Sequence, residues 1–383
     1  MSEKKEENLL LQSHRRTKHP FTMYESIHIS PEILRGCLAE DVINAIHKTA
    51  DEIDRRGIDN IVFTGTGTSY FSGLVGVYAL NEMAGIRGET ITSHELKNYV
   101  PAGFGNRSAL VGISHSGSTL VGTQSNEMAK HHGALVVSIT DVADSPMAKT
   151  SDLSIVGPGG RDMTIPKTRS YMSGVFRTLL LCAAIGEHKK PGTWDKWIKE
   201  FKRVPDVVEE ALEITDKVIE DYAKSFLKTR AFYCISYGAN VCTAQEASLK
   251  LLEGSLSMAI GLQAEEAIHG PLAAVDEKCA LVLIAPEGKG YERVERIAKG
   301  MHHFGIPIFG MGDPDASIKA SSDFFIGIPG KLNELFATIT YIPTLYLLSY
   351  WIAVHNGINP DILKSDNVKW LEAMQILMPP GSH

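Results

Sequence analysis

The chain has little cysteine, and what it has is not arranged for cross-linking. Five cysteines occur in 383 residues, an odd number, and no two of them form a C-x-x-C pair. A domain held together by disulfides would need more cysteines, in even number. The composition therefore favours a reduced protein, and we expect it to be cytoplasmic.

Positive charge and long hydrophobic runs are also scarce. The net charge is -7 and the pI is about 6.1, whereas a general nucleic-acid binder usually carries a basic face. The charged N-terminus lacks the apolar core of a signal peptide. The longest apolar run, at 341–354, contains Pro343 and is shorter than the roughly 20 residues that span a bilayer. We expect no nucleic-acid or membrane partner, and predict a buried helix over 341–354.

Clusters of metal ligands are missing from the sequence. His131–His132 and His302–His303 are adjacent pairs, and adjacent residues on a helix point in different directions. The sequence predicts no metal ion and no cofactor.

Short β-rich runs alternate with longer helical patterns along the whole chain. This alternation predicts an α/β fold with mostly parallel sheets flanked by helices. The predicted strands are NIVFTGT, SALVGIS, ALVVSIT and DLSIVGP in the first half, and AFYCISY, CALVLIA, IPIFGMG and DFFIGIP in the second.

The two halves keep the same spacing, which predicts a duplicated doubly wound subdomain. Gly67 and Gly238, Gly117 and Gly288, and Asp152 and Asp323 are each 171 residues apart, within similar local sequences. HHGAL at 131–135 and HFGIP at 303–307 are offset by 172. Agreement at four places indicates an internal repeat. The predicted organisation is an N-terminal segment (1–40), a first domain (41–195), a second domain (205–365) and a tail (366–383).

Two hydroxyl-rich loops of the first half suit an anionic ligand. FTGTGTSYFSG and SHSGST each follow a predicted strand and open a helix, so backbone N–H groups and hydroxyls can point at an anion. TIPKTRSY, at 164–171, adds two cations. The alternative is that Ser114 and Ser116 are helix caps, the glycines only permit turns, and the cations lie on a plain surface loop. A dinucleotide fingerprint is excluded, because Tyr70 stands where G-x-G-x-x-G needs glycine. The candidate ligand-binding residues are Thr66, Gly67, Thr68, Ser69, Ser114, His115, Ser116, Ser118, Thr119, Lys167 and Arg169.

A second informative stretch lies at 243–271. Glu246, Lys250, Glu253 and Ser257 have the spacing of one helix face, beside an apolar stripe of Leu249, Leu252 and Leu256. A carboxylate with a nearby histidine suits proton transfer in a sugar. Ordinary intrahelical ion pairs explain the same spacing.

These motifs together resemble the SIS (sugar isomerase) family. GTSYFSG, SHSGST, and LK-x-x-E followed by HGP, with Glu253 and His269 sixteen residues apart, are similar to the isomerase half of glucosamine-6-phosphate synthases and to related sugar-phosphate deaminases and deglycases. The resemblance covers about residues 30 to 365. It implies that the two loops bind the sugar phosphate, that Glu253 is the proton-transfer base, and that His269 opens the sugar ring from the neighbouring subunit of a homodimer. Lys250 would orient or tune the site.

The chain departs from that pattern at three places. His115 and Ser118 replace residues that are more often Gln and Glu in the synthases, so the sugar contacts would differ. Neither Lys364 nor Lys369 matches cleanly the tail lysine that forms an imine there. No glutaminase domain is recognisable, so we expect no use of glutamine as an ammonia source.

The sequence therefore predicts an enzyme of carbohydrate metabolism, an aldose–ketose isomerase working by enediol proton transfer. Its substrate would be a hexose with an anionic C6 group, 6-phosphate or 6-sulfonate. A glucosamine-6-phosphate deaminase or a fructosamine-6-phosphate deglycase would need the same base and histidine. A sugar-phosphate sensor without catalysis is a third possibility, which Glu253 and His269 disfavour.

Overall fold

A computed structural model describes residues 16–378 of the chain, which form two compact units. Of the described residues, the first unit contains 32–162, 169–205 and 365–378. The second unit contains 16–31, 163–168 and 206–364.

The first unit is built on a five-stranded parallel sheet with the strand order β2-β1-β3-β4-β5. Its inner strands carry almost only buried residues, as strands covered on both faces require. The strands are β1 (Asn60–Gly65), β2 (Gly88–Thr92), β3 (Ser108–Ile113), β4 (Leu135–Thr140) and β5 (Leu153–Val156).

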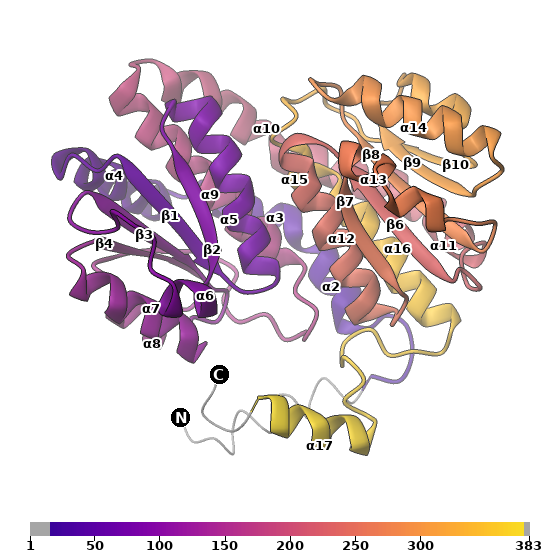
Figure 1. Ribbon diagram of the computed structural model, residues 1–383, viewed down its shortest axis with the longest axis horizontal. Helices are drawn as coiled ribbons and strands as arrows, with labels where there is room; N and C mark the ends of the chain where they lie inside the picture. The colour runs from indigo at the N-terminus through magenta and orange to yellow at the C-terminus, as the bar shows by residue number, and fades with distance from the viewer. Residues whose placement is uncertain (1–15, 379–383) are drawn as a thin grey trace. The chain divides into compact units, whose positions relative to one another are not determined.

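Helices cover both faces of this sheet (Figure 1). The chain steps from β1 outward to β2 through α5, then returns past β1 to β3 and continues to β5 in the opposite direction. Right-handed crossovers therefore put α5 on one face, with α4 and α9, and place α6, α7 and α8 on the other. The direction reverses between β1 and β3, and ligands of doubly wound sheets bind at the carboxyl ends of the strands at such a point. The helices are α3 (Ser30–Gly36), α4 (Glu40–Arg55), α5 (Thr68–Ala79), η1 (Leu80–Ala84), α6 (Ser93–Asn98), α7 (Leu120–His131), α8 (Pro146–Thr150), α9 (Arg169–Lys189) and α17 (Val368–Leu377).

The second unit repeats this plan. Its parallel sheet has the order β10-β9-β8-β6-β7, which is the order of the first sheet when equivalent strands are matched. The strands are β6 (Ala231–Ser236), β7 (Ala259–Gln263), β8 (Cys279–Ala285), β9 (Ile308–Gly312) and β10 (Phe324–Gly327). The helices are α2 (Thr22–His28), α11 (Ile219–Lys224), η2 (Gly238–Asn240), α12 (Val241–Gly254), α13 (Ala264–Ile268), η3 (Pro271–Ala274), α14 (Tyr291–His303), η4 (Ser317–Ser321), α15 (Ala337–Thr340) and α16 (Ile342–His355). Helix α10 (Thr193–Asp216) runs from the first unit into the second.

The equivalence of the two units extends to single hydrogen bonds. The Asp152 carboxylate accepts from the Val136 N–H at 2.9 Å, and the Asp323 carboxylate accepts from the Ile308 N–H at 2.8 Å. Gly67 and Gly238 share a left-handed φ, of 55° and 54°, where each opens a helix. The predicted duplication is confirmed.

All eight predicted strands are present, and two edge strands were missed. Both missed strands, β2 and β7, pair on one side only. Neither is fully buried, and β7 lies within the stretch 243–271, where the residue spacing indicated a helix.

The prediction for 243–271 was partly wrong. Helix α12 ends at Gly254, and Leu256 takes a positive φ of 54°, so Ser257 lies outside the helix. Leu251 is buried, whereas Leu252 and Leu256 are 38% and 37% exposed. The face that carries Glu246 and Lys250 is therefore the buried one, and the predicted leucine stripe is only partly buried or exposed.

The apolar run at 341–354 lies within a buried helical segment. Within residues 16–378, Ala337–His355 is long and apolar enough by length and composition to cross a membrane, and 94% of its most apolar window is buried inside the structure. The five cysteines are free and buried.

Candidate functional site

The loop after β1 presents backbone N–H groups and hydroxyls at the reversal point of the first sheet. Gly67 adopts a left-handed φ and is the N-cap of α5. A Cβ on Gly65 would lie 2.7 Å from the Ser69 carbonyl carbon, so the turn is tight. Thr66 is exposed, and Thr68 and Ser69 are half-buried. An anion here would meet the start of a twelve-residue helix, which is the positive end of the helix dipole.

Serine hydroxyls hold the loop after β3 in shape. The buried Ser114 hydroxyl accepts from the Gly117 N–H at 3.1 Å. The Ser116 hydroxyl lies 2.7 Å from the Ser118 hydroxyl. Thr119 is the N-cap of α7, so the alternative in which Ser114 and Ser116 cap the helix is wrong. Because Ser114 closes the turn, the more accessible hydroxyls of the loop are those of Ser116, Ser118 and Thr119.

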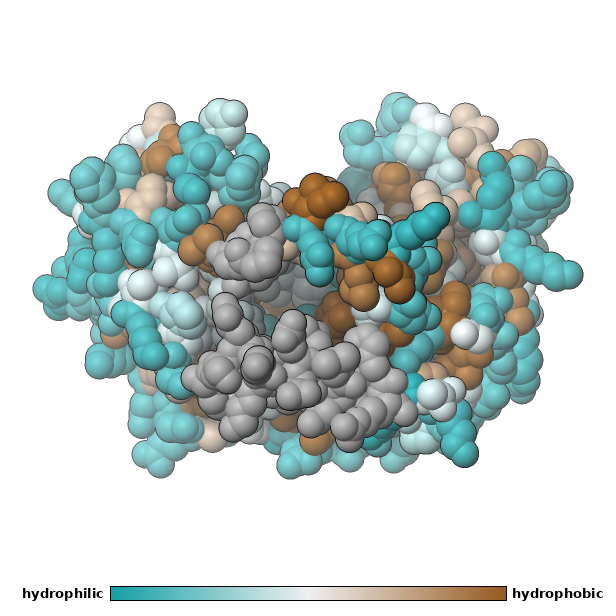
Figure 2. Space-filling model, turned by 90° about the horizontal axis from the view of Figure 1, so that it is seen from below, coloured by the Kyte–Doolittle hydropathy of each residue, from teal (hydrophilic) through white to brown (hydrophobic). Residues whose placement is uncertain are grey.

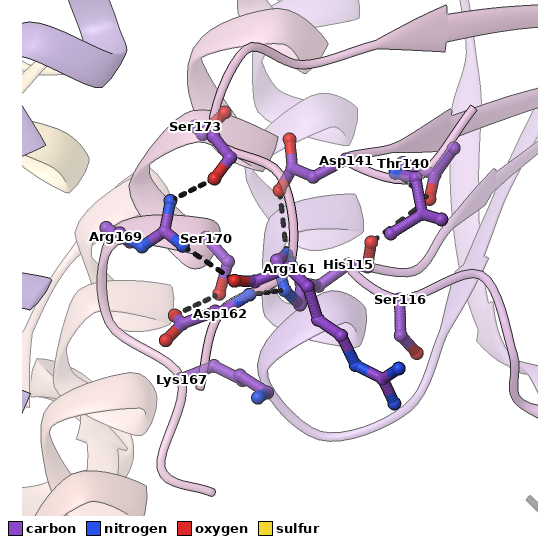
Figure 3. A network of polar contacts seen from close by, with 12 residues as sticks. His115, Ser116, Thr140, Asp141, Arg161, Asp162, Lys167, Arg169, Ser170 and Ser173 are labelled. Carbon is purple, nitrogen blue, oxygen red and sulfur yellow. Dashed lines mark hydrogen bonds and ion pairs between the residues drawn. The ribbon is translucent and has the colours of Figure 1, made fainter. Parts of the chain in front are cut away.

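His115 is bound on both sides of its ring by the chain itself (Figure 3). Its Nδ1 lies 2.8 Å from Asp141 Oδ2, and its Nε2 lies 2.7 Å from the backbone nitrogen of Asp162. A backbone N–H can only donate, so Nε2 accepts and the ring proton is on Nδ1, donated to Asp141. The structure therefore uses His115 to join two loops, and both ring nitrogens that the predicted sugar contact would need are occupied.

A buried arginine fixes the other end of this network. Arg177 on α9 donates to Asp141 Oδ1 at 2.6 Å, and their side chains are 1% and 2% exposed. Its remaining donors reach the carbonyl oxygens of Ser173, Thr140 and Ile155 at 3.1, 2.6 and 3.0 Å. Burial pushes the pKa of Asp141 upward, but the charge of Arg177 and the His115 hydrogen bond outweigh burial and hold this pKa below its usual value.

The two predicted cations also contact carbonyl oxygens of the chain. Arg169, the first residue of α9, donates to Gly159 O at 2.6 Å and to Arg161 O at 3.0 Å. In the second unit, Lys167 Nζ donates to Thr164 O. Next to Asp162, which binds His115, lies an exposed cation, Arg161, that was not predicted from the sequence. Its one sequence signal is that it follows a predicted strand, DLSIVGP, as the two hydroxyl-rich loops follow theirs.

In the second unit, the loop after β8 is the equivalent of the loop after β3, and side chains of the unit pack against its Gly288. A Cβ on Gly288 would lie 1.9 Å from Glu334 Oε2 and 2.8 Å from the Tyr237 hydroxyl. The Lys289 N–H donates to the same Glu334 oxygen at 3.2 Å. The equivalent Gly117 of the first unit is also closely packed, but a Cβ there would meet hydroxyl groups, 2.2 Å from Ser145 Oγ and 3.1 Å from Thr140 Oγ1. The two copies therefore differ in chemistry at this point: hydroxyls in the first unit, and a carboxylate that would repel an anion in the second.

Two of the predicted catalytic residues, Lys250 and Glu253, form a cluster with Glu246 on α12. Lys250 Nζ lies 3.5 Å from Glu246 Oε1 and contacts Glu253 Oε2. Glu246 Oε1 also accepts from the Tyr346 hydroxyl at 3.0 Å. Burial pulls the pKa of Lys250 downward, but Glu246 and Glu253 more than offset it, and the pKa is raised. Lys250 therefore stays charged between two carboxylates.

Glu253 differs from its two neighbours in being accessible. Its side chain is 23% exposed, against 1% and 0% for Lys250 and Glu246. Among residues 16–378, Lys250 is its one polar partner and binds Oε2. The remaining oxygen, Oε1, can therefore exchange a proton with a ligand. These pairs have the intrahelical spacing of surface ion pairs, but two of the three groups are buried.

His269 is exposed and is oriented by a second carboxylate. Its side chain is 68% exposed, and its Nε2 lies 3.3 Å from Glu265 Oε1. Arg293 binds Glu265 with two hydrogen bonds, of 2.5 and 2.6 Å, which lower the pKa of Glu265. This bidentate contact fixes the carboxylate beside the imidazole. Of the tail lysines, Lys364 is exposed, and Lys369 is exposed on α17.

Comparison with known proteins agrees with this architecture. Residues 56–184, which contain both open loops, match the SIS domain. Within this range the chain carries a SIS domain. A glutamine–fructose-6-phosphate aminotransferase (isomerizing) of Pyrococcus horikoshii is 34% identical over 340 residues, 88% of this chain and 56% of that protein. The chain thus spans little more than half the length of this relative.

Solved structures share the fold of this chain at low sequence identity. The C-terminal domain of glucosamine-fructose-6-phosphate aminotransferase from Francisella tularensis superposes with a TM-score of 0.82 at 21% identity, covering 90% of this chain and 98% of that one. Tagatose-6-phosphate ketose/aldose isomerase from Escherichia coli gives 0.76 at 17% identity, covering 90% and 95%. Proteins with this fold are thus named for different reactions, and the fold alone does not decide the reaction of this chain.

Proposed function

We propose that this SIS protein is an aldose–ketose isomerase acting on a hexose with an anionic C6 group, a 6-phosphate or a 6-sulfonate. In this proposal the open loops of the first unit bind the anion. Glu253 is the base and His269 assists ring opening. The reduced, buried cysteines suit work in the cytoplasm.

The residues have the chemistry that the reaction needs. Ring opening requires a proton delivered to the ring oxygen and one removed from the anomeric hydroxyl, which His269 can exchange. Glu253 Oε1 then takes the proton from C2 of the open-chain aldose, giving an enediolate. After a proton moves from O2 to O1, Glu253 returns its proton to C1 and the ketose forms. The base must be ionised to begin, and the charged Lys250 beside it favours the carboxylate.

The observation that carries the proposal is the Glu246–Lys250–Glu253 cluster. A protein that only senses an anion needs the two loops, but it has no use for a buried lysine that orients an accessible carboxylate. Burying such charges is unfavourable unless they are paired. The arrangement therefore favours catalysis over sensing.

The experiment that tests the reaction is proton NMR in D₂O with fructose 6-phosphate. We expect aldose signals to appear, with deuterium entering at C1 or C2, because the proton on Glu253 exchanges with solvent between the two transfers. If neither aldose signals nor deuterium in the sugar appears, the isomerase proposal is contradicted for this substrate. The aminotransferase relative would then favour an amine-bearing substrate, and the same assay with glucosamine 6-phosphate or a fructosamine 6-phosphate would test deamination or deglycation.

We further propose that the enzyme is a homodimer in which His269 completes the partner's site. His269 is strongly exposed, which suits a residue that acts outside its own unit. Hydrophobic side chains are visible among hydrophilic ones on the face drawn in Figure 2. Around α12, β7 and α13 of the second unit, five such side chains are 37–66% exposed, as an interface requires: Leu252, Leu256, Met258, Ile260 and Ile268.

Mixing two inactive variants tests the shared site. Glu253→Gln and His269→Asn each remove one group, so each homodimer should be inactive. A hybrid dimer has one site with both groups intact, and random exchange should restore about a quarter of the wild-type activity. Native mass spectrometry measures hybrid formation. Hybrids without activity would place both groups in the same subunit.

A further inference from the structure

Within the proposed function, on which this inference rests, we propose that Arg161 binds the anionic C6 group and that His115 positions the Arg161 loop instead of contacting the sugar. Arg161 lies in the segment between β5 and α9. β5 pairs in parallel with β4, and β4 with β3, so the carboxyl ends of all three strands lie at the same end of the sheet.

His115 connects this segment directly to the anion-binding loop. The hydrogen bond of 2.7 Å from the Asp162 N–H to His115 Nε2 links two residues, and Arg161 and Ser116 are their immediate neighbours. In Figure 3 the Arg161 side chain extends away from the buried network on the side where Ser116 lies. The segment that carries the exposed Arg161 is thus linked by a hydrogen bond to the loop that carries the exposed or half-buried hydroxyls.

Arg169 fixes the same segment from its other side. Its guanidinium donates to the carbonyl oxygens of Gly159 and Arg161, so the backbone is fixed at both ends of residues 159–161. A fixed backbone reduces the entropy lost when the side chain closes on a ligand. Arg177 is buried against Asp141, whereas Arg161 is exposed to solvent, where a dissolved anion can reach it.

The role of Arg161 is tested by calorimetric binding of inorganic phosphate to the full chain. Arg161→Ala removes a charge-assisted donor and should weaken binding about 10–100-fold, whereas Arg161→Lys should lose less because it keeps the charge. Arg87→Ala is the matched control. Arg87 is also exposed in the first unit, but it directly precedes β2 and so lies at the amino ends of the strands, away from the anion loops. We expect its affinity to stay within about twofold of the wild type.

A double-mutant cycle tests the positioning role of His115. If His115 acts through Arg161, His115→Ala should weaken phosphate binding several-fold in the wild type and add little in the Arg161→Ala background. Additive losses would overturn this role. Arg161 is exposed, so we expect the Arg161→Ala variant to fold even if His115→Ala does not. The role of Arg161 can then still be tested by its single variant.

The possible failures can be told apart. If Arg161→Ala keeps wild-type affinity while Ser116→Ala lowers it, the Arg161 assignment is wrong and the proposed anion site stands. If the wild type neither binds phosphate nor turns over fructose 6-phosphate, both the inference and the 6-phosphate form of the proposed function are overturned.

Discussion

Replacing Glu253 with Gln is expected to lower kcat by about 10²–10⁴-fold, the usual contribution of a general base. The amide has nearly the shape of the carboxylate and keeps an oxygen that can accept from Lys250, but it cannot take a proton from C2. Deuterium entry from D₂O into the sugar should fall in parallel with turnover. Inorganic phosphate should still bind, because the anion loops belong to the other unit.

A matched substitution separates loss of the base from loss of an ion pair. Glu292 forms an exposed pair with Arg296, four residues along α14, so Glu292→Gln removes a carboxylate from a helix without touching the cluster. Turnover of this variant should stay within about twofold of the wild type. If Glu253→Gln keeps wild-type turnover, Glu253 is not the base, and if it loses phosphate binding as well, its effect is structural.

Most of the fold could be predicted because buried parallel strands are nearly continuous apolar runs. β3 and β4 consist of six buried residues each, and both were predicted within one residue of their ends. The edge strand β7 has only partly buried or exposed residues, such as Ile260, and its pairing with β6 leaves no trace in its own pattern. The end of α12 was missed because it depends on the backbone conformation of Leu256.

The chemistry of the site was harder to predict than its location. Hydroxyls after two adjacent strands indicated the anion loops, since the reversal point of the sheet brings them together. The partners of His115, however, are Asp141 and Asp162, 26 and 47 residues further along the chain. Only the fold decides whether a histidine faces a ligand or joins two loops. In the same way, the burial of Lys250 depends on the packing of α16 against α12, which Tyr346 and Ser349 mark with hydrogen bonds.

Replacing Asp141 with Asn should produce the largest loss of stability. The Arg177 side chain is 1% exposed, and Asp141 is its one carboxylate partner among residues 16–378. Removing one partner of a buried ion pair leaves an uncompensated charge and destabilises by about 3–5 kcal/mol. For a unit of this size that loss corresponds to a fall in Tm of roughly 6–20 °C, measurable by calorimetry.

The exposed pair of Asp59 and Arg107 provides the control, because their side chains are 59% and 71% exposed. Asp59→Asn should change stability by no more than about 1 kcal/mol. The pKa of Asp141 is lowered in the folded protein, so its contribution is complete above its unfolded pKa of about 3.8 and is lost as the pH falls through the folded value. The difference in stability between wild type and Asp141→Asn should therefore be constant near neutral pH and shrink in strong acid. Equal effects of the two Asp→Asn variants at neutral pH would mean that water reaches Arg177, and the network could not then hold the His115 loop rigidly in place.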